Sequence, residues 1–156
     1  MSAVIECLVL ACGNTLRGDD GVGAFLARWA EERFGDNPGV RIIARQQWTP
    51  DLAAEIAEAE TIIFIDCSIE SRAGQILLKE VHAAPRDAGV ATHHTGAPEL
   101  LALAQELYQT CPRCSVLLTV GAGSTELGEE FSPAIRDALP EACRLLERTV
   151  RNSIAS

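Results

Sequence analysis

The chain has 156 residues, 47% of them hydrophobic and 4% aromatic, which suits one aliphatic core. Its 22 acidic and 13 basic residues give a formal net charge of −9, which disfavours nucleic acid as a partner. No segment approaches the roughly 18 apolar residues that span a bilayer, and no signal peptide is apparent. We therefore expect a cytoplasmic protein without membrane insertion, whose six cysteines stay reduced.

Apolar runs and helical spacing predict the secondary structure. A continuous apolar run at residues 4–12 predicts a buried first strand. Apolar residues at helical spacing over residues 20–34, followed by Gly35, predict a helix. The same patterns predict further strands at 40–44, 61–65, 76–81 and 115–120, and further helices at 50–59, 98–108 and 133–150.

The order of these elements predicts the fold class. Strands that alternate with helices are typical of an α/β domain with a mostly parallel, twisted sheet covered on both faces. We find no linker or internal repeat, so residues 1–156 are expected to form one domain. Ligands of such sheets bind beyond the carboxyl ends of the strands. Residues 13–23, 66–68 and 93–94 follow strands or precede a helix, and we expect them to converge there.

The segment after the first strand is rich in glycine and acidic. Gly13 to Gly18 has the glycine spacing of a phosphate-binding loop, but Asp19-Asp20 stands where a Lys-Ser/Thr pair would be needed. The dinucleotide fingerprint is not completed after Gly23 either. Two adjacent carboxylates repel each other unless a cation compensates. The loop therefore favours a metal ion and argues against a nucleotide cofactor.

Each acidic residue also has a structural interpretation. Asp19 is placed to cap the following helix, which leaves Asp20 for a ligand. Asp66 follows an apolar strand, where its carboxylate either caps a turn or binds a metal. Two carboxylates with an imidazole suit nickel, zinc or a similar divalent ion. The residues themselves do not choose between His93 and His94 for that imidazole.

Together these segments resemble the hydrogenase maturation endopeptidases, which trim the C-terminus of the large subunit of nickel-iron hydrogenases. The resemblance spans nearly the whole chain. It rests on an ordered set of motifs: Gly13-Asn14-x-Leu16-x-Gly18-Asp19-Asp20-Gly21-x-Gly23, an apolar strand ending at Asp66, His93 before a Leu-rich helix, Leu118-Thr119-Val120-Gly121, Glu126-Leu127-Gly128 and Ser132-Pro133.

The resemblance implies a three-layer αβα fold and an endopeptidase that removes the C-terminal extension of a nickel-iron hydrogenase large-subunit precursor after nickel insertion. Its metal-contacting positions fall on Asp20, Asp66 and one histidine, with His93 favoured over His94. The nickel is expected to arrive with the substrate. The two carboxylates are the candidate catalytic residues, and either the nickel polarises the scissile carbonyl or a carboxylate such as Asp20 activates water.

Five further residues are candidates for contact with the substrate: Gly13, Asn14, Trp48, Thr49 and His94. The loop at residues 46–50 departs from the Gly-Gly-Thr-type segment of many members of the family, so it bears on substrate choice. Three other functions stay open on sequence grounds: a stand-alone metallohydrolase, a nucleotide-binding regulatory module, and a non-catalytic chaperone of hydrogenase assembly.

Overall fold

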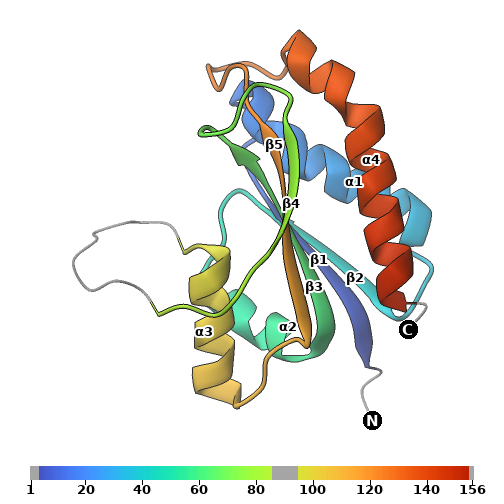
Figure 1. The fold of residues 1–156 in the computed structure, drawn as a ribbon, viewed down its shortest axis with the longest axis vertical. Coiled ribbons are helices and arrows are strands. Elements are labelled where there is room, and N and C mark those ends of the chain that lie inside the picture. The colour runs from blue at the N-terminus through green and yellow to red at the C-terminus, as the bar shows by residue number, and fades with distance from the viewer. Residues whose placement is uncertain (1–3, 86–94, 155–156) are drawn as a thin grey trace.

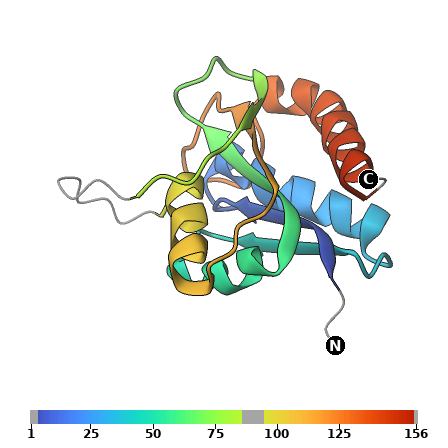
Figure 2. The ribbon, with the colours of Figure 1, turned by 60° about the horizontal axis from the view of Figure 1, so that its bottom comes forward.

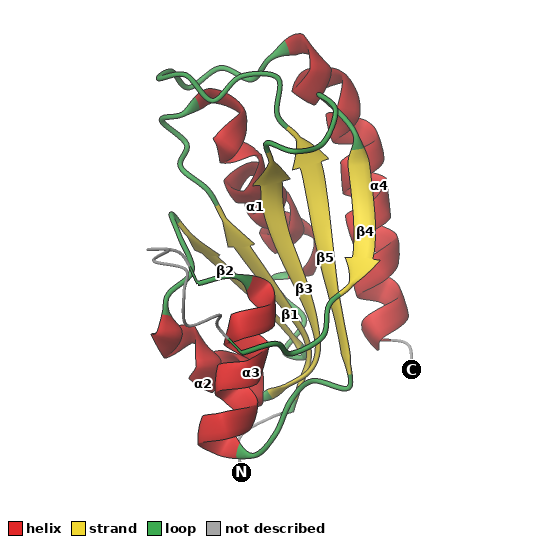
Figure 3. Cartoon of the chain, turned by 60° about the vertical axis from the view of Figure 1, so that its left-hand side comes forward, coloured by secondary structure: helices red, strands yellow, loops and turns green. Residues whose placement is uncertain are grey.

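A computed structural model describes residues 4–85 and 95–154. Within these residues, five strands form one sheet in the order β2-β1-β3-β5-β4. The strands are β1 (Ile5–Cys12), β2 (Val40–Arg45), β3 (Ala59–Ser68), β4 (Ile76–Glu80) and β5 (Cys114–Gly121). All neighbouring strands pair in parallel except β4, which runs antiparallel to β5 at the edge (Figure 3). The prediction of a mostly parallel sheet is confirmed.

Helices cover both faces of this sheet. α1 (Val22–Phe34) and α4 (Pro133–Ile154) lie on one face, and α2 (Ala53–Ala57) and α3 (Ala97–Tyr108) lie on the other (Figures 1 and 2). The fold is therefore a three-layer αβα sandwich with a hydrophobic core on each side of the sheet.

The central strand β3 shows how the sequence builds both cores. Ile63 and Ile65 pack with α1 and α4, whereas the alternate residues Ile62 and Phe64 pack with α2 and α3. Successive side chains of a strand point to opposite faces of the sheet, so a continuous apolar run supplies both layers. Burial of each such side chain stabilises the fold by about 1.5–3 kcal/mol.

Some elements differ from the predicted boundaries. The predicted helix at 20–34 begins with a 3₁₀ turn, η1 (Gly18–Gly21), before α1. The predicted helix at 50–59 is a 3₁₀ turn, η2 (Pro50–Leu52), followed by the short α2. Strand β3 runs beyond Asp66 to Ser68, because these residues continue to pair with β5. Asp66 is therefore a strand residue, and the interpretation that it caps a turn is wrong.

The last helix, α4, is amphipathic. Its buried residues recur at intervals of three and four: Ile135, Ala138, Ala142, Leu146 and Val150. This spacing aligns them on one face of a helix. In the described parts of the chain, no helix combines the length and apolar character needed to cross a membrane.

Candidate functional site

Two loops lie against each other at the carboxyl ends of the parallel strands. We name residues 13–21, after β1, the acidic loop, and residues 122–132, between β5 and α4, the β5–α4 loop. The amide of Asp19 donates to the carbonyl of Ser124 (2.9 Å), and the amide of Gly18 donates to that of Gly128 (2.7 Å). The amide of Gly128 in turn donates to the carbonyl of Leu16 (2.8 Å). The two loops are thus joined along their backbones.

Glycine is required at two positions of the acidic loop. Gly13 has a φ of +146°, and a Cβ there would lie 2.0 Å from the carbonyl oxygen of Asp20. Gly18 has a φ of +55°, and its Cβ would lie 2.9 Å from the carbonyl oxygen of Ser124. Residues other than glycine rarely adopt such φ values. Gly13 therefore allows the backbone to pack closely against Asp20, and Gly18 allows the acidic loop to pack closely against the β5–α4 loop.

The acidic loop holds the half-buried carboxylate of Asp20. The amide of Asn14 donates to Asp20 Oδ2 (2.7 Å), and the amide of Leu16 donates to Asn14 Oδ1 (2.9 Å). Asn14 and Gly13 thus shape the loop around Asp20. Contact of either residue with a substrate remains a prediction.

Asp66 lies on β3, next to β1, and is also half-buried. Its Oδ1 accepts a hydrogen bond from the amide of Cys67 (2.8 Å). The thiol of Cys12, at the end of β1, forms a hydrogen bond with the Asp66 carboxylate. The end of β1 and the end of β3 thereby meet at this carboxylate.

Cys12 and Cys67 lie near both predicted aspartates. Burial raises the pKa of both thiols, and the negative charges of Asp20 and Asp66 raise it further. The pKa of Cys67 reaches about 12, and that of Cys12 is also far above its ordinary value. Both cysteines are therefore neutral thiols near pH 7, and Asp20 and Asp66 lie in one neighbourhood around them. The structure brings these two predicted site residues together.

Asp19 does not cap the helix that follows it, so that expectation is wrong. Its side chain is 0% exposed, and neither η1 nor α1 has a side-chain cap. Its carboxylate instead accepts hydrogen bonds from the amides of Gly123 (2.6 Å), Ser124 (2.9 Å) and Ser132 (2.7 Å) and from the Ser132 hydroxyl (2.7 Å). A carboxylate has about four acceptor positions, so these donors occupy it. Asp19 is therefore not available to a metal or a substrate.

The same contacts set the protonation of Asp19. Burial alone would raise its pKa, but the hydrogen bonds from Ser132, Ser124 and Gly123 together lower the pKa below its ordinary value. Hydrogen bonds to the ionised form of a carboxyl group favour that form. Asp19 is therefore a fixed negative charge inside the protein.

The remaining predicted site residues are two histidines and the neighbours Trp48 and Thr49. His93 and His94 lie outside the described residues. Within residues 4–85 and 95–154, no group of three His, Cys, Asp or Glu side chains is arranged to hold a metal ion. Trp48 is 6% exposed and packs edge-on against Phe64, with ring centroids 5.2 Å apart. Thr49 is half-buried and its hydroxyl donates to Asp51.

The burial of Trp48 favours a role in core packing over contact with a substrate. The side chain belongs to the core between the sheet, α2 and α3, and it offers almost no surface to a substrate. The predicted substrate contact of Trp48 would need the ring to leave this core. Thr49, at the start of η2, is the more accessible of the two candidates.

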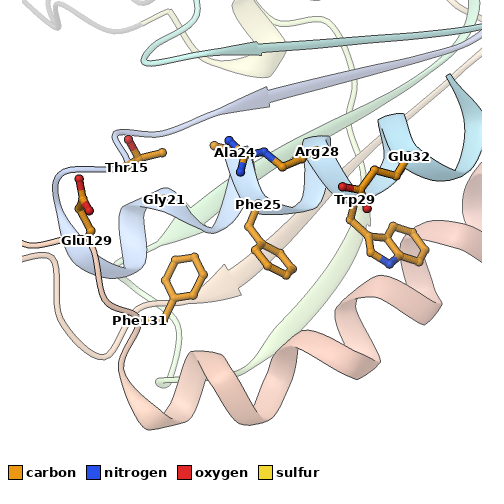
Figure 4. A pocket seen from close by; sticks show the side chains of 9 residues that line it. All are labelled: Thr15, Gly21, Ala24, Phe25, Arg28, Trp29, Glu32, Glu129 and Phe131. Atoms are coloured by element: carbon orange, nitrogen blue, oxygen red, sulfur yellow. The ribbon is translucent and has the colours of Figure 1, made fainter.

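A pocket of ≈ 420 Å³ adjoins the acidic loop, between α1 and the β5–α4 loop. Figure 4 shows Phe25 of α1 and Phe131 of the loop facing each other; their ring centroids are 5.9 Å apart in an edge-on arrangement. Thr15 and Gly21 line the pocket beside Asp20. The apolar residues at helical spacing over residues 20–34 predict only a core-facing stripe, so the sequence does not reveal this pocket. The 40% exposure of Phe25 follows from its position at the edge of the buried stripe.

Exposed apolar side chains lie on three segments that adjoin the two carboxylates. Leu16 of the acidic loop is 53% exposed, Ile69 directly after β3 is 82% exposed, and Leu127 of the β5–α4 loop is 80% exposed. Leu16 and Leu127 were recognised only as parts of motifs. Large apolar residues grouped on a surface mark sites of contact with other molecules.

The fold has close counterparts of known structure, although no protein-family model and no curated protein matches the sequence. A NiFe hydrogenase maturation protease from Thermococcus kodakarensis aligns with a TM-score of 0.70 and 23% identity over 97% of this chain and 94% of that chain. The hydrogenase maturating endopeptidase HybD from E. coli aligns with a TM-score of 0.68 and 20% identity over 94% and 93%.

A third similar structure comes from an archaeon. The hydrogenase 2 maturation peptidase from a Thaumarchaeota archaeon aligns with a TM-score of 0.67 and 22% identity, covering 92% of this chain and 97% of that chain. The three alignments leave only a small share of any chain unmatched. The chain therefore has the fold of the hydrogenase maturation proteases.

Proposed function

We propose that the protein is an endopeptidase that removes the C-terminal extension of a nickel-iron hydrogenase large-subunit precursor. The observation that carries this proposal is that Asp20 and Asp66 lie around the same two thiols at the carboxyl edge of the sheet, in a fold shared over nearly its whole length with hydrogenase maturation proteases. Fold alone does not determine function. The two carboxylates supply the chemical groups that an endopeptidase needs.

Nickel bound to the precursor is the recognition element in this proposal. Asp20, Asp66 and His93 contact the nickel, while the precursor supplies the remaining ligands. Carboxylate oxygens and an imidazole nitrogen are suitable donors for such an ion. A cation bound between two carboxylates compensates their negative charge. The scissile bond is thereby fixed next to them only when the precursor is loaded.

The carboxylates also suit the hydrolysis itself. One of them accepts a proton from water as the water oxygen attacks the scissile carbonyl carbon, and the proton then passes to the leaving amine as the C–N bond breaks. The neighbouring Cys12 and Cys67 are neutral thiols and are poorly suited to act as nucleophiles, since the thiolate is the reactive form.

The surface around the carboxylates suits a protein substrate. Leu16, Ile69 and Leu127 expose apolar side chains at the edge where the acidic loop and the β5–α4 loop meet. A small polar substrate would gain little from them, whereas a folded precursor can bury them. The formal net charge of −9 favours a partner whose contacting surface carries positive charge.

The test is incubation of the protein with a nickel-loaded precursor, with intact mass measured over time. We expect the precursor to lose its C-terminal extension. A stable complex without cleavage would instead identify a non-catalytic assembly chaperone. Metal analysis of protein prepared without chelators separates a third function, because a stand-alone metallohydrolase would retain its own metal ion.

A further inference from the structure

We propose that Asp19 is a positioning residue that fixes Asp20 for the reaction by tying the acidic loop to the β5–α4 loop. The inference rests on the proposed function, because it assigns a role within the same site. It concerns a residue that does not itself touch the substrate. Asp19 and Asp20 are adjacent in sequence, yet their carboxylates face different surroundings.

The Asp19 carboxylate joins segments that are more than 100 residues apart. It accepts hydrogen bonds from the amides of Gly123 and Ser124, which follow β5, and from Ser132, which precedes α4. Hydrogen bonds to a charged acceptor are about twice as strong as neutral ones. With the carboxylate 0% exposed, water does not compete for these donors. The anchor is therefore strong and geometrically specific.

Ser132 extends this anchor into α4. Its hydroxyl donates to Asp19 Oδ2 (2.7 Å) and accepts a hydrogen bond from the amide of Ile135 (3.4 Å), in the first turn of the helix. A negative charge near the first turn of a helix is also favoured by the helix dipole. Asp19 thus stabilises the start of α4, the distant helix, rather than the start of α1.

The position of Asp20 depends on this anchor through the backbone. The peptide that links the two residues is restrained, because the amide of Asp20 donates to the carbonyl of Arg17 (3.1 Å). The carbonyl of Asp20, on the next peptide, packs closely against Gly13. On the other side, Asp20 Oδ2 is held by the amide of Asn14 (2.7 Å). Loss of the Asp19 anchor would loosen residue 20 and this hydrogen bond together.

The experiment compares Asp19→Asn with Val150→Ala. In Asp19→Asn an amide NH₂ group replaces one carboxylate oxygen. Because both oxygens of Asp19 accept hydrogen bonds, this NH₂ group must face at least one hydrogen-bond donor. Val150 is 0% exposed and lies near the far end of α4, so its truncation destabilises the fold away from the site. Both variants are expected to lower the Tm, and only Asp19→Asn is expected to affect the reaction.

Two readouts are measured on the folded variants. In single-turnover cleavage of the nickel-loaded precursor, Asp19→Asn is expected to lower the maximal rate roughly 10- to 100-fold with little change in the precursor concentration at half-maximal rate. Hydrogen exchange of the Asn14 amide, measured without any substrate, is expected to accelerate in Asp19→Asn and to stay unchanged in Val150→Ala.

The substrate-free readout separates this inference from the proposed function. If the unmodified protein cleaves nothing, the proposed function fails, and acceleration at Asn14 still supports the anchor. Unchanged exchange at Asn14, or equal cleavage rates in Asp19→Asn and Val150→Ala, would overturn the positioning role. If Asp19→Asn does not fold, Ser132→Ala takes its place, since it removes one donor and leaves the charge with its three backbone amides. The same two readouts and the same outcomes then apply.

Discussion

Asp19 and Asp20 stand side by side in the sequence but occupy contrasting regions of the molecule. Asp19 is enclosed, with its oxygens hydrogen-bonded to the β5–α4 loop. Asp20 is half-buried and shares the neighbourhood of Cys12 and Cys67 with Asp66. The Asp19 carboxylate is surrounded by donors that belong to the fold, whereas the Asp20 carboxylate lies near the same two thiols as Asp66.

This contrast shows that the role of a buried charge depends on what satisfies it. A carboxylate whose acceptor positions are occupied by backbone amides stabilises the structure and is unavailable to a ligand. Carboxylates that raise the pKa of neighbouring thiols instead form a concentrated negative site, which a cation or a transferred proton can compensate. Variants of these residues should therefore separate stability from activity.

The largest effect on activity is expected at Asp20 and Asp66. Asp20→Asn and Asp66→Asn should each reduce cleavage of the nickel-loaded precursor roughly 10²- to 10⁴-fold, because each removes a charge that, in the proposed function, contacts the nickel or the attacking water. Their Tm should stay within a few degrees of the unmodified protein. Mass spectrometry of the product and thermal unfolding measure the two quantities. Full activity in either variant would remove that residue from the site.

The third predicted nickel contact gives the next largest effect. His93→Ala should slow cleavage roughly 10- to 100-fold, and His94→Ala should slow it less, since the resemblance places the metal contact on His93. Rates of both variants are measured on the same preparation of precursor. A larger loss in His94→Ala would show that the assignment is shifted by one residue.

The enclosed carboxylate should matter most for stability. Asp19→Ala leaves the amides of Gly123, Ser124 and Ser132 without their acceptor, and each unsatisfied buried donor costs about 1–3 kcal/mol. We expect the free energy of unfolding to fall by at least about 3 kcal/mol. Urea denaturation measures it, with Asp20→Ala as the neighbouring control. Equal losses in the two variants would erase the contrast between the adjacent carboxylates.

The pH dependence of stability should be smaller but specific to Asp19. Because its pKa in the folded protein lies below the ordinary value of 3.8, its contribution is complete above that value and is lost as the pH falls towards the lowered pKa. The stability difference between the protein and Asp19→Asn should therefore shrink between about pH 4 and the acid limit of folding. Urea titrations at a series of pH values measure the difference. A constant difference would contradict the lowered pKa.

The smallest effect is expected at Trp48. Trp48→Phe keeps an aromatic ring against Phe64 and should change the free energy of unfolding by less than about 1.5 kcal/mol. The cleavage rate should stay within about twofold, because the side chain is 6% exposed. Parallel denaturation and cleavage assays measure the two quantities. A marked loss of activity at unchanged stability would instead support the substrate contact predicted from the sequence.

Much of the fold follows from the sequence because the signals are local. The apolar run before Gly13 and the alternation of strands and helices predict the order and type of the main elements. The antiparallel direction of β4 does not follow, since a short strand has the same pattern in either direction. The extension of β3 through Ser68 depends on pairing with β5, a distant segment.

The site shows the same division between local and distant information. The placement of Asp20 and Asp66 at one edge of the sheet is predictable, because Asp20 follows β1 and Asp66 lies near the end of the neighbouring parallel strand β3. The role of Asp19 is not, because Gly123 and Ser132 lie more than 100 residues away, and the local pattern favours a helix cap instead. The exposure of Phe25 likewise depends on how α1 packs beside the β5–α4 loop.

The most direct measurement is parallel cleavage of one precursor in nickel-loaded and nickel-free form, followed by intact mass. If Asp20 and Asp66 recognise nickel carried by the substrate, the loaded precursor loses its C-terminal extension and the nickel-free precursor stays intact under the same conditions. Equal cleavage of both forms would contradict that recognition.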